Sequence, residues 1–264
     1  AGSAKIPMKA GALTTSGLLV VAEPKLLPPM DLEARFEGGV LARVTGQGQS
    51  EDFGKATIDA QRGTGFWQLN LTTQRFQLPL GFDVPLTDFS LSSRLAPDGL
   101  TISDAKGWNS EGELGASGAL TWNRGWKLSA KLKAKRVNIA KFAPKWMANG
   151  FMDGQAELSA EAPTAAELYA RTRMQGRATL GRGVLAGVDF DRVVQGRGVG
   201  EQYTFETLEG NVQLDARRYD FTDIRLTAGE LGATGAFGIA PDGAVRGRFA
   251  VEVKAARMRL TGGV

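Results

Sequence analysis

Apolar and polar residues alternate along most of the chain with a period of two, which is typical of β-strands that bury one face. In the stretch from Trp126 to Ala134, every second residue is apolar, including Leu128 and Leu132. The same alternation recurs in Gly247–Leu260. No long amphipathic helix pattern separates these segments, so the pattern predicts antiparallel pairing without crossover helices.

Both of these segments change parity near their ends. In the first, the apolar parity changes between Ala134 and Val137, and in the second between Ala255 and Met258. A slip of one residue turns every later side chain to the opposite face, and a β-bulge restores the apolar face. We therefore predict a bulge at each of the two places.

A nine-residue sequence occurs twice, as Gly112–Leu120 and as Gly229–Phe237. The copies differ only where Ser117 and Leu120 of the first are replaced by Thr234 and Phe237 in the second. The alternating segments that follow the two copies also match in pattern. This recurrence favours a duplicated β-meander unit.

The tetrapeptide Ala96–Gly99, with the sequence APDG, predicts a hairpin turn. Proline presets the backbone angle φ at the second position, aspartate suits the third, and we expect Gly99 to take the left-handed conformation. The same tetrapeptide recurs as Ala240–Gly243.

Residues 138–176 have a different pattern and predict a small helical insert. Asn138 can cap a short turn, Pro144 can begin another before Lys145–Ala148, and Thr164 with Glu167 forms a capping-box pattern. These helices are too short to form a domain. We expect one β-domain over 1–264, with the insert covering one end of the sheet.

Composition excludes several kinds of chemistry. The chain has no cysteine and no histidine, so disulfides, thiolate chemistry and histidine acid–base catalysis are excluded. The pair Asp189 and Asp191 is interpreted as solvated carboxylates rather than a metal site, and the glycines from 196 to 200 as a turn, because no helix follows to bind a phosphate. We expect no enzyme activity, no metal and no cofactor.

Lysines occupy the polar positions of the segment after the first repeat. A solvated face explains them, and contact with anionic lipid headgroups is the alternative. Nucleic-acid binding is not expected, because no aromatic residues interleave with them. These lysines are Lys127, Lys131, Lys133 and Lys135.

The apolar faces of all these strands must be removed from water together. A closed β-sandwich would bury them sheet against sheet, whereas a curled but open sheet would offer an apolar groove to hydrocarbon chains. Burying a methylene is worth about 0.8 kcal/mol and needs no directional bond. The pattern alone leaves both alternatives open. The side chains expected to line such a groove are Trp67, Leu69, Leu71, Leu128, Leu132, Val212, Leu214, Phe221, Phe249, Val251 and Val253.

One part of the chain resembles a known family. Residues 151–192, with the sequence GRATLGRGVLAGVDF at 176–190, and the later FETLEGNVQL at Phe205–Leu214 are similar to the C-terminal region of the AsmA family. The resemblance covers about residues 138–260 and is looser before them. AsmA-like and TamB-like proteins are bacterial envelope proteins with an N-terminal helix in the inner membrane.

The resemblance implies a fold and a function. The implied fold is an all-β antiparallel meander curled into an open apolar groove (β-taco-like). The implied function is to bind and conduct phospholipid between inner and outer membrane, in the periplasm, with membrane-embedded or outer-membrane partner proteins. This chain lacks the membrane helix, so we interpret it as a segment of a longer protein. A closed sandwich that scaffolds envelope or outer-membrane protein assembly is the alternative.

Overall fold

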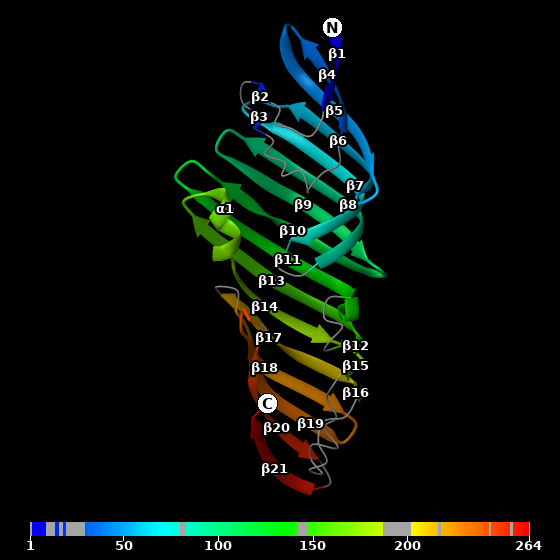
Figure 1. The fold of residues 1–264 in the computed structure, drawn as a ribbon, viewed down its shortest axis with the longest axis vertical. Helices are drawn as coiled ribbons and strands as arrows, with labels where there is room; N and C mark the ends of the chain where they lie inside the picture. Colours follow the sequence, from blue (N-terminus) through cyan, green and yellow to red (C-terminus); the bar gives the residue numbers. More distant parts are fainter. Residues whose placement is uncertain are drawn as a thin grey trace. The chain divides into compact units, whose positions relative to one another are not determined.

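The computed structural model describes residues 2–8, 14–15, 18–19, 30–79, 83–141, 147–186, 202–215, 218–242, 244–253 and 256–263. Within these ranges the protein is almost entirely β-structure, and sixteen strands follow one another in one hydrogen-bonded order from β1 to β21 (Figure 1). The neighbouring strands pair in the antiparallel direction, and among the described residues β1 and β21 form the two ends of this order without pairing with each other. The predicted all-β, antiparallel, open sheet is therefore confirmed.

The chain divides into two compact units, and each is described by itself. Unit 1 comprises 1–109 and 115–124, and unit 2 comprises 110–114 and 125–264. The strands of unit 1 are β1 (Gly2–Met8), β2 (Thr14–Thr15), β3 (Leu18–Leu19), β4 (Met30–Glu37), β5 (Val40–Ser50), β6 (Gly54–Arg62), β7 (Trp67–Pro79), β8 (Asp83–Ala96) and β9 (Gly99–Asn109). Strand β10 (Gly112–Thr121) has residues in both units.

Unit 2 contains a large sheet, a small sheet and three short helical turns. Its large sheet has the strands β11 (Trp126–Asn138), β13 (Phe151–Ala162), β14 (Arg173–Leu180), β17 (Thr207–Asp215), β18 (Arg218–Ala228), β19 (Leu231–Ile239), β20 (Val245–Val253) and β21 (Ala256–Gly263). The small sheet consists of β12 (Met147–Asn149), β15 (Gly183–Ala186) and β16 (Gln202–Phe205). The helical turns are η1 (Ile139–Lys141), α1 (Ala165–Leu168) and η2 (Tyr169–Arg171).

Strand β11 contains the first predicted bulge. Ala134 pairs with Gly154 and Val137 pairs with Met152, so two residues of β11 oppose the single Asp153. Arg136, inside the bulge, has a φ of 52°, and its backbone N–H donates to the Asp153 carboxylate. The bulge at Ala134–Val137 is therefore confirmed.

The second predicted bulge, at Ala255–Met258, does not lie within one continuous strand as expected. Strand β20 ends at Val253, and β21 begins at Ala256 and pairs with β20 in the antiparallel direction. The chain reverses here instead of continuing as one strand, and the pairing after the reversal is irregular, because Val253 pairs with Ala256 whereas Val251 pairs with Leu260. A reversal changes the parity of apolar residues just as a bulge does, which explains the misinterpretation.

The turn between β8 and β9 forms where the sequence predicts it, but Gly99 is needed for another reason. Ala96 pairs with Gly99 across a two-residue turn. Gly99 is not among the described residues with positive φ. A Cβ there would lie 2.9 Å from the backbone oxygen of Leu120, so the close approach of β10 excludes a larger residue.

Residues 138–176 are mostly strand in the described part. The amide of Asn138 accepts a hydrogen bond from the Ala140 N–H, as a cap would, and the Thr164 hydroxyl donates to the Glu167 carboxylate. The helical turn predicted over Lys145–Ala148 does not form at its described end, because Met147–Asn149 is strand β12. Pro144, Lys145 and Trp146 lie outside the described residues.

Several glycines on the apolar face are crowded by the neighbouring strand, whereas on the opposite face the space differs from one glycine to the next, and a Cβ on Gly238 would lie 2.6 Å from the Asp220 carboxylate. In unit 2, a Cβ on Gly176 would lie 2.7 Å from the Ala156 Cβ, but one on Gly232 would meet nothing closer than 4.0 Å. In unit 1, the corresponding distances are 2.8 Å at the buried Gly107 and 3.8 Å at Gly115. Because side chains converge on the concave side of a curved sheet, the close approach at Gly176 and Gly107 is expected where the apolar face is concave.

The small sheet covers part of the apolar face of unit 2. Met147, Tyr203 and Phe205 from the small sheet pack in one buried cluster with residues of the large sheet. Phe205 is the largest member that is fully buried, with an exposure of 0%. The large-sheet members of this cluster are Leu180, Leu226, Leu231, Ala233 and Val251.

We expect Phe205→Ala to lower the free energy of unfolding by about 3–5 kcal/mol, because it leaves a cavity in this cluster. Phe237→Ala, at a half-buried site outside the cluster, is the matched control and should cost clearly less. Urea denaturation of both variants measures the difference. Equal losses would show that Phe205 does not hold the small sheet on the large one.

Candidate functional site

A row of apolar residues runs across the large sheet of unit 2, with one residue from each of six neighbouring strands. The register places Leu132 opposite Ala156, and the row continues strand by strand to Phe237. All of its members are half-buried. They are Leu132, Ala156, Gly176, Val212, Phe221 and Phe237.

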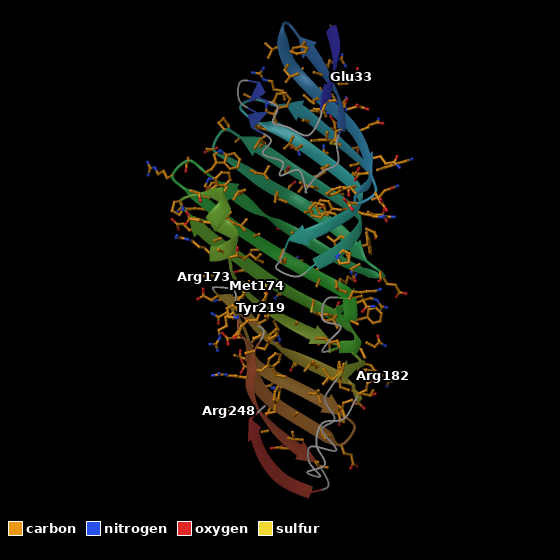
Figure 2. The ribbon with its side chains drawn as sticks, viewed as in Figure 1. Glu33, Arg173, Met174, Arg182, Tyr219 and Arg248 are labelled. Atoms are coloured by element: carbon orange, nitrogen blue, oxygen red, sulfur yellow. The ribbon has the colours of Figure 1, made fainter. Side chains whose placement is uncertain are left out.

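A second row lies next to the first, two residues along each strand. It is also apolar, and Met174 and Tyr219, both labelled in Figure 2, flank Leu214 within it. Its members are Ala130, Leu158, Met174, Leu214, Tyr219 and Ile239, of which only Leu158 is buried. We call the two rows together the open strip. None of its side chains carries a charge.

Aromatic rings are stacked within and beside the open strip. The ring centroids of Phe221 and Phe237 lie 4.5 Å apart with an interplanar angle of 18°, and those of Tyr219 and Phe221 lie 6.5 Å apart. The Phe249 ring extends the series at 6.2 Å from Phe237. Such stacking fixes bulky side chains on a face that they only half bury.

The other part of the same face is the covered strip, which lies beneath the small sheet. Its row runs from Met152 through Leu180, Leu208, Leu226 and Ala233 to Val251. Met152 and Leu208 are partly buried, and the other four have exposures between 2% and 7%. The face is thus sealed by protein along the covered strip and left half-exposed along the open strip.

A bulge in β18 lies between the two strips. Phe221 of the open strip pairs with Phe237. The next residue of β18 on the apolar face is Ile224, which pairs with Gly235. Asp223 inside this bulge has a φ of 53° and accepts a hydrogen bond from the Asn211 side chain at 2.9 Å. Because bulges bend a strand and increase its twist, this bulge changes the direction of β18 between the open strip and the covered strip.

The structure distributes the predicted lining residues of unit 2 over both strips. Leu132, Val212, Leu214 and Phe221 lie in the open strip, whereas Val251 lies in the covered strip. Leu128 is half-buried and pairs with Ala160 beyond the open strip. Half-buried Phe249 pairs with Gly235, and half-buried Val253 pairs with the buried Leu231.

The predicted lining residues of unit 1 share one face of β7. Trp67, Leu69 and Leu71 are half-buried, and the register places them opposite Leu95, Ser93 and Leu91 of β8. Ser93 is fully buried, and its hydroxyl has no hydrogen-bond partner among the described residues.

The predicted headgroup lysines lie on the opposite face of β11. The Lys127 ammonium lies 3.0 Å from the Glu161 carboxylate, and the Lys131 ammonium lies 3.7 Å from that of Glu157. Lys133 and Lys135 are exposed on the same face. These four side chains therefore point away from the open strip.

Sequence reasoning missed the small sheet and part of the open strip. The alternation of Tyr203 and Phe205 was visible, but nothing indicated that the chain changes sheets at Glu206, because no glycine or proline marks the break. Met174, Tyr219 and Phe237 carry the correct parity for the open strip, and the register of β14, β18 and β19 was needed to align them.

No metal site is found in the part of the chain that the structure describes, since no three His, Cys, Asp or Glu side chains gather there. Asp189, Asp191 and the glycines from 196 to 200 lie outside the described residues. Among the described helical segments, none has the length and apolar character needed to cross a membrane.

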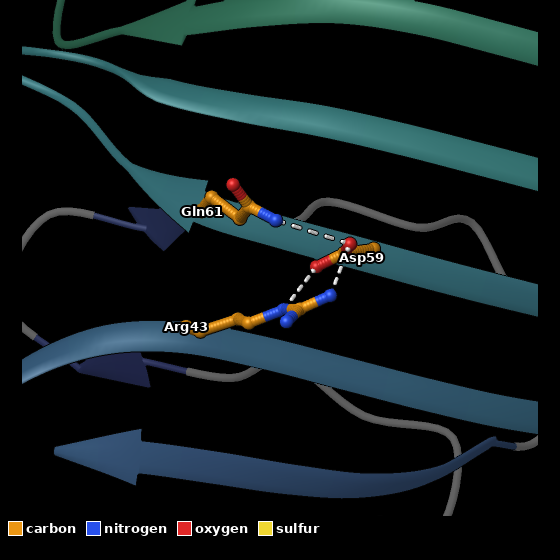
Figure 3. Close-up of polar contacts among 3 residues, drawn as sticks. All are labelled: Arg43, Asp59 and Gln61. Carbon is orange, nitrogen blue, oxygen red and sulfur yellow. Dashed lines mark hydrogen bonds and ion pairs between the residues drawn. The ribbon is translucent and has the colours of Figure 1, made fainter.

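The best-defined polar contact lies on the polar face of unit 1. The Arg43 guanidinium donates two hydrogen bonds to the Asp59 carboxylate, at 2.8 and 2.7 Å, and Gln61 donates a longer one at 3.4 Å (Figure 3). The hydrogen bond from Arg43 holds the pKa of Asp59 below its ordinary value of 3.8. This pair joins β5 to β6 and is too exposed to contribute much to stability.

No protein-family model, curated protein or solved structure matches this chain.

We expect Asp59→Asn to reduce the pH dependence of Tm in acid. Because the folded-state pKa is depressed, the carboxylate contributes stability above about pH 3.8 and loses it as pH falls through the lower folded value. The Tm gap between the native chain and the variant should therefore shrink from pH 6 to pH 2. Gln61→Ala, which removes only the longer and weaker hydrogen bond to the same carboxylate, is the control and should retain most of the acid dependence of the native chain. A gap that stays constant would contradict the assignment.

Proposed function

We propose that this chain is a periplasmic segment of an AsmA-like protein that binds phospholipid acyl chains on its apolar β-face and conducts them between inner and outer membrane. The observation that supports this most is the open strip of unit 2, where uncharged apolar side chains remain half-exposed on six successive strands. A soluble protein rarely leaves such a surface without a ligand or a partner. The resemblance over about residues 138–260 supports the same function.

The chemistry of the strip suits a hydrocarbon ligand. Each methylene transferred from water to an apolar surface contributes about 0.8 kcal/mol, and no hydrogen bond is needed. The ligand can therefore slide from one group of side chains to the next without breaking directional contacts. The proposal includes no catalytic step and no cofactor.

The proposal also places the full-length protein in the bacterial envelope. An anchor outside this chain would hold the protein at the inner membrane, which would supply the lipid. Membrane-embedded or outer-membrane proteins would receive it. Lys127, Lys131, Lys133 and Lys135 face away from the strip, so they are better suited to a membrane surface or a partner than to the headgroup of a lipid lying in it.

Lipid recovery from the purified chain tests this function. Organic extraction or native mass spectrometry of the native protein is expected to recover acyl lipids. Leu132→Glu with Val212→Glu should abolish the recovery, because charges in the open strip cannot be paired by an acyl chain.

Ser129→Glu with Gln213→Glu is the matched control. It adds the same charge to the exposed face of the same two strands and should leave lipid recovery unchanged. Circular dichroism establishes that both proteins are folded. Equal recovery from the two variants, or no lipid from the gently purified native chain, would refute the proposal.

A second candidate function is a scaffold for envelope or outer-membrane protein assembly, in which protein and not lipid covers the apolar face. The covered strip favours it, because Met147, Tyr203 and Phe205 already seal part of the face with protein. A face that is covered by protein has no surface free for a ligand, so a scaffold would not bind a fluorescent fatty acid. Saturable binding of that probe favours lipid conduction over this alternative.

A further inference from the structure

The small sheet of unit 2 occupies only one side of the apolar face. Tyr203 and Phe205 have exposures of 9% and 0%, and they bury Leu226, Leu231 and Val251 beneath them. No acyl chain can contact side chains that are already packed against protein at this density. In the open strip, by contrast, Phe221 and Phe237 stay half-exposed although they stack on each other.

The dimensions of the open strip restrict how a chain can lie on it. Strands β11, β13, β14, β17, β18 and β19 contribute to it, and with about 4.8 Å between neighbours these six strands span about 24 Å. One acyl chain covers about 15 Å, half the hydrocarbon thickness of a bilayer. A chain lying across the strands therefore has room to move while it remains on apolar side chains.

A chain lying along the strands would not fit as well. The two rows of the open strip are two residues apart, or about 7 Å, and one further row separates them from the covered strip. That intervening row contains Ala134, Gly154, Ala178 and Gly210. A chain of about 15 Å that starts at Met174 and runs parallel to β14 would end near Ala178, over small residues that offer it little apolar side-chain surface.

We propose that the small sheet β12–β15–β16 confines the acyl chain in unit 2 to the open strip, where the chain lies across the strands, and excludes it from the covered strip. This inference rests on the proposed function and adds a position, an orientation and a role for the small sheet. The small sheet acts as a side wall of the lipid path and not as a part of it.

Photocrosslinking tests where the chain lies. A benzophenone side chain is introduced at Tyr219 or Phe237 of the open strip, or at Leu226 of the covered strip, and each protein is incubated with vesicles of an alkyne-tagged phosphatidylglycerol. We expect lipid adducts at Tyr219 and Phe237 and none above background at Leu226. Adducts at Leu226 equal to those at Phe237 would overturn the division of the face.

Two substitutions provide a second measurement that does not depend on the bulky probe. Leu226→Ala should lower Tm but change binding of a fluorescent fatty acid less than about twofold, because it opens a cavity only in the covered strip. Phe237→Glu should weaken the same binding by about tenfold or more, because it places an unpaired charge under the chain. Loss of binding in folded Leu226→Ala, with binding retained in Phe237→Glu, would overturn the inference.

The outcomes separate this inference from the proposed function. If the native chain binds lipid but crosslinks equally in both strips, lipid binding stands and the confinement by the small sheet is refuted. If the native chain neither binds the fatty acid nor yields any adduct, both the proposed function and this inference fail.

Discussion

An antiparallel sheet with one apolar face must remove that face from water, and this requirement organises the protein. The alternation of apolar and polar residues gives each strand a buried side and a solvated side, and the register aligns the buried sides into continuous rows. On the solvated side, opposite charges meet across strands, as for Arg177 and Glu209 at 2.8 Å. Such exposed pairs fix register more than they stabilise the fold. The apolar rows therefore supply the stability.

Curvature is one way in which the sheet meets this requirement, and glycine makes it possible. Side chains on a concave face converge, and the space at Gly176 and Gly247 is already occupied by the Cβ atoms of Ala156 and Phe237 at 2.7 and 2.5 Å. A larger residue at either position would force the strands apart. The high glycine content, 35 residues with only 10 prolines, is thus partly a consequence of close approach between strands and not only of turns.

The fold class could be predicted from the sequence, because period-two alternation reports directly which residues share a face. The bulge at Ala134–Val137 followed from the same signal. The change of parity at Ala255–Met258 looked identical but marks a reversal of the chain, because parity alone does not distinguish an extra residue from a turn. The small sheet was not predictable for a related reason. Phe205 and Leu208 have the apolar character expected of one strand, yet they belong to different sheets. Only contacts distant in sequence separate them.

The two candidate functions, a lipid conduit and a sealed scaffold, place opposite demands on the same face, and unit 2 meets both over different parts of it. A sealed face contributes stability but admits no ligand, whereas an open face admits a ligand and leaves apolar surface in water. The buried cluster around Phe205 supplies packing that the open strip lacks, so the strip need not be covered for the unit to fold. The stacked rings of Phe221 and Phe237 bury part of each other's surface and reduce the cost of exposure. A bulge at the boundary lets one set of strands serve both strips, because β18 can change direction between Phe221 and Ile224 without interrupting the sheet.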